Sequence, residues 1–108
     1  NGDGTFANGA HSNVGPNAVA NSALGLVVGD YTGDGRLDAY VLITTSSGGV
    51  RPMTGAGTGS FTSGNFVATG ALPGLNAIAT ADLNGDGYLD LVLTNRSSGT
   101  VTVVPNGL

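Results

Sequence analysis

A nine-residue motif rich in aspartate and glycine occurs twice in the chain, 52 residues apart. The copies read Asp-Tyr-Thr-Gly-Asp-Gly-Arg-Leu-Asp at 30–38 and Asp-Leu-Asn-Gly-Asp-Gly-Tyr-Leu-Asp at 82–90, with six of nine positions identical. Each copy is followed by an apolar run, a Ser-Ser-Gly turn and a further run containing valine. Because a repeat forms one structural unit that packs against the next, the fold is built from two similar units.

The composition favours strands over helices. Among 108 residues there are 20 Gly, every acidic residue is Asp, every basic residue is Arg, and Lys and Glu are absent. Few charges together with many β-branched and small polar residues suit short strands joined by tight turns, and they suit surface helices poorly. We therefore expect an all-β chain.

The sequence also excludes several classes of protein and of site. With no Cys, disulfides, cysteine-ligated zinc, iron–sulfur clusters and cysteine nucleophiles are excluded. Three scattered Arg in a chain of net charge −4 provide no basic surface for phosphates or anionic lipids. The apolar runs are far shorter than a bilayer span. We expect neither nucleic-acid binding nor membrane insertion.

Each unit is predicted to contain four strands, because apolar and alternating runs are separated by turn residues. The first strands are expected at 24–28 and 77–81, the second at 39–44 and 89–94, the third at 50–54 and 100–104, and the fourth from Phe6 and from Phe61. Residues 1–108 then form one two-blade unit, with the fourth strand of a split blade at about 5–12, a complete blade at about 17–70 and three strands of a second blade at about 75–108.

These segments resemble the FG-GAP or VCBS repeats of the integrin α β-propeller, of secreted bacterial proteins and of some lectins. The resemblance rests on residues 81–92, Ala-Asp-Leu-Asn-Gly-Asp-Gly-Tyr-Leu-Asp-Leu-Val, and on residues 1–6, Asn-Gly-Asp-Gly-Thr-Phe. It implies two four-stranded antiparallel β-propeller blades, with calcium in the loop between the first and second strands. A closed ring needs at least about four blades, so we expect neighbouring copies to complete the propeller.

The loop 82–90 has the donor set of a calcium site. It offers side-chain oxygens at positions 1, 3, 5 and 9 and a main-chain carbonyl at position 7, from Asp82, Asn84, Asp86, Asp90 and Tyr88. Hard oxygen ligands in this number suit Ca²⁺. The alternative is a metal-free turn in which the carboxylates accept backbone N–H groups.

The loop 30–38 is predicted to be a second, weaker calcium site. Its ligands would be Asp30, Thr32, Asp34, Asp38 and the carbonyl of Arg36. A Thr hydroxyl at position 3 is a poorer calcium ligand than a carboxylate or an amide. An empty turn of the same shape is the alternative. The chain is thus expected to bind up to two Ca²⁺ ions.

No motif of an enzyme is present. His11 is the only imidazole, and the chain has neither a Gly-x-Ser-x-Gly nor a Gly-x-Gly-x-x-Gly motif, so we expect no enzyme. Tyr31 and Tyr88 lie in the two loops, where a ring either stacks on a sugar or faces solvent, and we favour the second. Asn95 begins the sequon Asn-Arg-Ser, a tripeptide that is common by chance.

The combined prediction is an extracellular or cell-surface calcium-binding module that acts as a structural or adhesive building block. Its partner is expected to be itself, with the N-terminal strand of one copy completing the last blade of the next. This gives a ring of three or four copies or a head-to-tail filament. The alternatives are an excerpt of a longer propeller, and a carbohydrate-binding lectin; a glycan or an extracellular protein is then the further partner.

Overall fold

The computed structural model of the chain describes residues 2, 5, 9, 11–14, 23–44, 48–69 and 74–107. Every regular element in these ranges is a β-strand, and all strand pairs are antiparallel. The strands are β1 Ala23–Gly29, β2 Asp38–Ile43, β3 Gly49–Gly55, β4 Phe61–Ser63, β5 Val67–Ala68, β6 Leu75–Ala81, β7 Asp90–Asn95 and β8 Thr100–Val104. The expected all-β fold class is confirmed. The fourth strand expected near residues 5–12 lies mostly outside the described residues.

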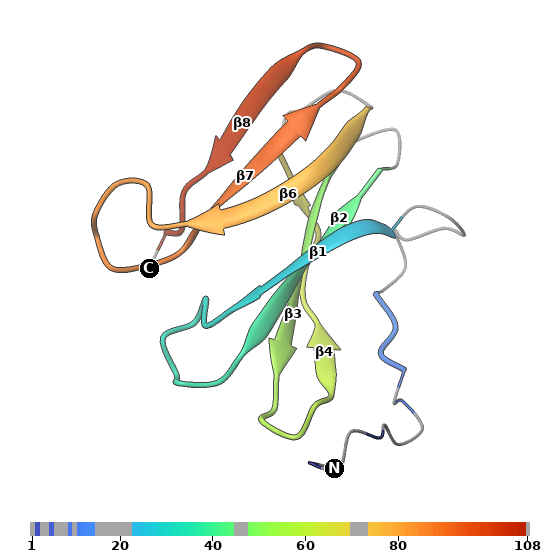
Figure 1. Cartoon of the computed structure of the whole chain (residues 1–108), viewed down its shortest axis with the longest axis vertical. Coiled ribbons are helices and arrows are strands. Elements are labelled where there is room, and N and C mark those ends of the chain that lie inside the picture. The colour runs from blue at the N-terminus through green and yellow to red at the C-terminus, as the bar shows by residue number, and fades with distance from the viewer. Residues whose placement is uncertain are drawn as a thin grey trace.

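The strands form two sheets, which we call the first and the second sheet (Figure 1). The first has the order β1-β2-β3-β4, with β5 also paired to β3, and the second has the order β6-β7-β8. The repeat extends to the register in which the strands pair. Val28 pairs with Ala39 in the first sheet, and Thr80, 52 residues later, pairs with Leu91. The bulge near the start of β1 recurs near the start of β6.

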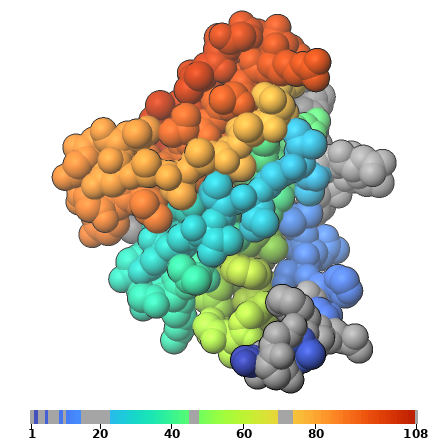
Figure 2. All heavy atoms as spheres, in the orientation of Figure 1, coloured from blue at the N-terminus to red at the C-terminus, as the bar shows by residue number. Residues whose placement is uncertain are grey.

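The two sheets pack face to face and share one apolar core. Side chains from both sheets meet there, and the buried ones are Tyr31, Leu42, Val50, Leu75, Leu91 and Leu93. Strand β6 contacts both β1 and β2, and the second sheet lies directly against β1 in the space-filling view (Figure 2). Gly25 faces the second sheet, since a Cβ added there would be in ordinary van der Waals contact with Ile78 Cγ2, at 3.5 Å. Burial of these side chains fixes the position of one sheet relative to the other.

The opposite face of the first sheet has its own apolar cluster. Ala39, Val41, Ile43 and Met53 are buried there beneath partly buried side chains, namely Val14, Phe61 and Phe66. The Arg51 guanidinium lies 5.9 Å from the centre of the Phe66 ring and donates to the Gly64 carbonyl. At the edge of β4, the Phe61 N–H donates to Ser12 Oγ over 3.2 Å. The segment 11–14 is thereby held against the first sheet.

The fourth strand of the first sheet is interrupted, which the sequence did not predict. Met53 pairs with Ser63 and Val50 pairs with Val67, so three steps along β3 correspond to four along the partner. The extra residue divides the strand into β4 and β5. Pro52 lies opposite the break and has no N–H to donate to a ladder, which explains why the pairing fails at this point.

Candidate metal centre

The two Asp-rich loops occupy the same place in each repeat. One connects β1 to β2 and the other connects β6 to β7, and both project to the same side of the molecule (Figure 1). Each begins at the end of a first strand and ends at the buried start of a second strand. This is the position that the resemblance implies for calcium.

The first aspartate of each loop organises the turn around its carboxylate. Asp30 Oδ1 accepts from the N–H of Gly33 and Asp34, at 2.8 and 3.2 Å, and Oδ2 accepts from Gly35 at 2.8 Å. Asp82 accepts from the corresponding residues Gly85, Asp86 and Gly87 at 2.8, 3.2 and 2.9 Å. The Gly35 N–H is the main cause that lowers the pKa of Asp30. The wrapping requires a left-handed backbone at two positions in each loop, and glycine supplies it at all four: Gly33 (φ +77°), Gly35 (φ +81°), Gly85 (φ +76°) and Gly87 (φ +89°).

The residues at positions 5 and 7 are placed similarly in both loops. Asp34 Oδ1 accepts from the N–H of Arg36 at 2.8 Å, and Asp86 Oδ1 accepts from that of Tyr88 at 2.9 Å. At position 3 the loops differ. Asn84 Oδ1 accepts from the N–H of Asp86, whereas the Thr32 hydroxyl donates to Asp38 Oδ2. Thr32 therefore directs its hydrogen toward the last residue of its loop.

The aspartate at position 9 has a role that the sequence did not reveal. Asp38 is buried, and its Oδ2 accepts from the N–H of Tyr31 and Thr32 while its Oδ1 accepts from that of Gly55 at 2.9 Å. The Asp38 carboxylate therefore joins the start of its loop to the end of β3.

Asp90 is buried in the same way. Its Oδ2 accepts from the N–H of Leu83 and its Oδ1 from that of Asn106. Asn106 corresponds to Gly55 by strand register, because the third strands of the two repeats are related by a shift of 51 residues, from Met53 to Val104. The N–H groups of Asn106 and Leu83 lower the pKa of Asp90. The only sequence signal for this role is the recurrence of an Asp just before each second apolar run.

Three carboxylates converge in the first loop. One oxygen from each of Asp30, Asp34 and Asp38 lies within 4.8 Å of the others. Among the described residues this is the one group of three acidic or imidazole side chains that meets so closely, so Asp82, Asp86 and Asp90 are spaced more widely. The remaining predicted ligands, Arg36 and Tyr88, are exposed in their loops.

One prediction about the aromatic residues in the loops is wrong. Tyr31 does not face solvent, because it is 5% exposed and packs edge-on against Tyr40, with ring centres 4.8 Å apart. Burial raises the pKa of Tyr31, and the nearby Thr80 hydroxyl offsets part of this rise. Tyr88 is exposed as expected. The burial of Tyr31 depends on the second sheet, which local sequence does not report.

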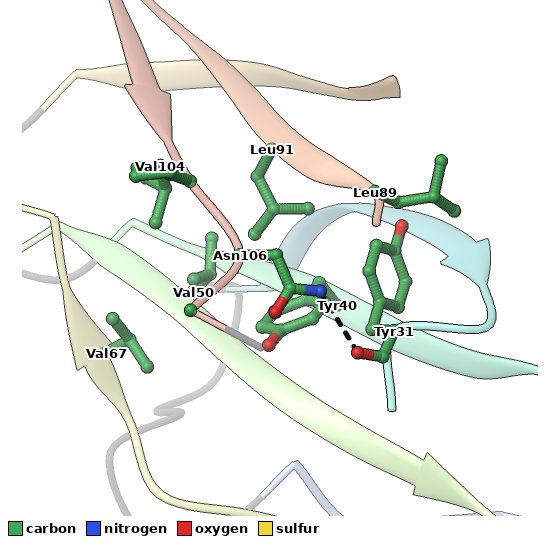
Figure 3. Close-up of a pocket in the computed structure, with 10 residues that line it drawn as sticks. Tyr31, Tyr40, Val50, Val67, Leu89, Leu91, Val104 and Asn106 are labelled. Carbon is green, nitrogen blue, oxygen red and sulfur yellow. Dashed lines mark hydrogen bonds between the residues drawn. The ribbon is translucent and has the colours of Figure 1, made fainter. Parts of the chain in front are cut away.

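A small cavity of about 170 Å³ separates the two sheets beside these loops (Figure 3). Tyr31, Leu89 and Asn106 line it from different elements, and the Asn106 side-chain amide donates to the Tyr31 carbonyl over 3.0 Å. Asn106 thus ties the first loop to the second sheet through its side chain and the second loop through its backbone.

Asn95 lacks the exposed side chain that a glycosylated asparagine needs. Its side chain is 2% exposed, and Oδ1 accepts from the N–H of Ser97 and Ser98. A glycan on Nδ2 would have to displace this turn.

Comparison with known proteins supports the assignment of the repeat. The model of the FG-GAP-like repeat family matches residues 39–93, a span of 55 of the 108 residues that includes the second loop. Curated proteins and solved structures gave no match. Within the described ranges, no helix is long and apolar enough to cross a membrane. The chain belongs to the FG-GAP-like repeat family, and its two sheets are repeat units of the β-propeller type.

Proposed function

We propose that the chain is a calcium-binding module of extracellular proteins, in which the loops 30–38 and 82–90 each hold one Ca²⁺ ion. The observation that carries this proposal is the convergence of Asp30, Asp34 and Asp38 to within 4.8 Å. Like charges at this spacing repel each other, and a divalent cation between them removes the repulsion. FG-GAP-like repeats often bind calcium in the corresponding loop, which also supports calcium binding by this chain.

The loops have spare capacity for a cation. A carboxylate has about four lone-pair sites, and the three N–H groups on Asp30 leave part of that capacity free. The N–H groups hold the loop in a turn before any ion enters, so ion binding requires little further ordering of the backbone. The hydrogen bonds of a metal-free turn and calcium binding are therefore compatible.

The second loop is proposed to bind calcium more tightly than the first. At position 3 it has the amide oxygen of Asn84, which is a good calcium ligand, whereas the first loop offers only the hydroxyl oxygen of Thr32, which is a poorer one. In an extracellular setting the ion is available at millimolar concentration, in the range where such modules bind.

Thermal unfolding tests this function. Extracellular modules bind calcium with dissociation constants of about 10⁻⁴ to 10⁻³ M, so about 10 mM Ca²⁺ stabilises a filled site by roughly 1.4–2.7 kcal/mol. For a domain of this size, that raises the Tm by several degrees relative to EDTA. Asp86→Ala is expected to remove most of the increase, and Asp34→Ala a smaller part. Asp3→Ala, outside both loops, serves as the matched control.

Two results would count against the proposal. One is a Tm that is the same in calcium and in EDTA. The other is an increase that persists in the double variant Asp34→Ala/Asp86→Ala, since the ion would then bind elsewhere.

A further inference from the structure

The two Asp-rich loops contact each other directly. A Cβ added at Gly33 in the first loop would lie 3.7 Å from Cε1 of Tyr88 in the second, so the Tyr88 ring is within van der Waals reach of the first loop. Leu89 lies closer still, because a Cβ at Gly29, the residue before Asp30, would come within 2.6 Å of its Cδ1. The loops are 52 residues apart in sequence, yet a movement of either one displaces side chains of the other.

A chain of hydrogen bonds also joins the last aspartates of the two loops. The Asn106 N–H donates to Asp90 Oδ1 over 2.8 Å, and the Asn106 side-chain amide donates to the Tyr31 carbonyl over 3.0 Å (Figure 3). The Tyr31 N–H in turn donates to Asp38 Oδ2 over 3.2 Å. Asn106 and Tyr31 therefore connect a proposed ligand of one ion to a proposed ligand of the other.

Packing holds this chain of hydrogen bonds in place. Asp38 and Asp90 are 3% and 1% exposed, and Tyr31 packs edge-on against Tyr40 between the sheets. Hydrogen bonds to a carboxylate are strong, and a buried carboxylate has no bulk water to replace a lost donor. A displacement of the aspartate at one end is therefore passed on to the other end.

We propose that the two calcium sites are coupled, so that an ion in one loop strengthens binding in the other, and that Asn106 is the positioning residue that couples them. This coupling rests on the proposed calcium binding. The first ion fixes the last aspartate of its loop, and with it Asn106 and Tyr31, so the second ion binds with a smaller loss of conformational entropy. The effect is mutual, because each ion must change the affinity for the other by the same factor.

Calorimetric titration with calcium chloride measures the coupling. The first loop, the weaker site, binds its ion beside a filled second loop in the wild type and beside an empty one in Asp86→Ala. We expect its dissociation constant to be about fivefold higher in Asp86→Ala. Asn106→Ala keeps the backbone N–H that bonds Asp90 and removes the bond to Tyr31. In that background the difference between the two dissociation constants is expected to disappear.

Asn76→Ala is the matched control. Asn76 Oδ1 accepts from the Thr94 hydroxyl over 3.0 Å at an exposed position near the start of β6, whereas the loop follows the end of that strand. Losing this bond should leave the ratio of the two dissociation constants as it is in the wild type. A general loss of stability weakens binding with and without Asp86 alike, so only a role in coupling changes the ratio.

Amide hydrogen exchange gives a second readout, which needs no Asn106 variant. In Asp34→Ala only the second loop is expected to bind, and calcium should nevertheless slow exchange of the Tyr31 N–H in the first loop. In the double variant Asp34→Ala/Asp86→Ala, calcium should leave that exchange unchanged.

The outcomes separate the coupling from the proposed function. A folded chain that binds no calcium would refute both. Equal first-loop affinities in the wild type and in Asp86→Ala, or Tyr31 exchange that calcium does not slow in Asp34→Ala, would overturn the coupling and leave calcium binding intact. A difference in affinity that persists in Asn106→Ala would overturn the role of Asn106.

Discussion

At the scale of single residues, Asp38 and Asp90 differ from the other aspartates of their loops because they are buried and bonded to two elements at once. The sequence placed them among the metal ligands, and it could not show that they also hold the third strand. That role depends on Gly55 and Asn106, which follow 17 and 16 residues later. A ligand set can be predicted from spacing within a loop, whereas a contact of this range cannot.

The first prediction separates the two roles of Asp38. In EDTA, where metal does not contribute, Asp38→Ala leaves the N–H groups of Tyr31 and Gly55 without their acceptor. We expect a loss of about 2–3 kcal/mol in the free energy of unfolding, measured with urea. Asp34→Ala is the matched control, and because that side chain is exposed we expect a change within about 0.5 kcal/mol. Equal effects of the two substitutions would contradict a special role for Asp38.

The second prediction concerns acid. The N–H groups of Asn106 and Leu83 hold the pKa of Asp90 below its ordinary value of 3.8. The unfolded chain therefore takes up this proton first as the pH falls, so the stabilisation is complete above the unfolded pKa and is lost as the pH drops through the folded one. In EDTA the urea midpoint is expected to be level from about pH 5 to 7 and to fall below about pH 4. Asp90→Asn should make that fall shallower, and a midpoint that rises on acidification would contradict this account.

At the scale of secondary-structure elements, the apolar runs predicted most strands to within two residues. The strand expected at 100–104 is β8, and those expected at 39–44 and 89–94 are β2 and β7, each displaced by one residue. Period-two alternation and the turn residues around it are local signals, which explains this agreement. The division of the fourth strand into β4 and β5 was not predictable, because it depends on which residue lies opposite Pro52.

The third prediction tests how tightly β3 is joined to the first loop. A Cβ at Gly55 would overlap the Leu37 carbonyl, whereas a Cβ at Gly107 would meet nothing within 4 Å. Gly55→Ala should therefore lower the free energy of unfolding by roughly 1–3 kcal/mol, since backbone atoms must move to make room. Gly107→Ala is the control and should leave stability nearly unchanged. Thermal and urea unfolding of both variants provide the measurement, and a neutral Gly55→Ala would show that β3 and the loop are joined loosely.

At the scale of the whole molecule, the repeat determines the architecture more than any single motif does. The shift of 52 residues relates the loops, the β1–β2 and β6–β7 pairs and the bulges of the two sheets. It also relates the covered face of the first sheet to an exposed face of the second, for example Val27 to Ala79. The sequence predicted the existence of two units, and the burial of Tyr31 showed which faces they use. That information comes only from the packing of one sheet on the other.

Calorimetric titration of the chain with calcium chloride measures whether the two loops are calcium sites. We expect up to two ions per chain, with the tighter one lost in Asp86→Ala and the weaker one lost in Asp34→Ala. Asp3→Ala should titrate as the wild type does. A wild-type chain that is folded and takes up no calcium at 10 mM, or one whose binding is unaffected in the double variant, would contradict the claim.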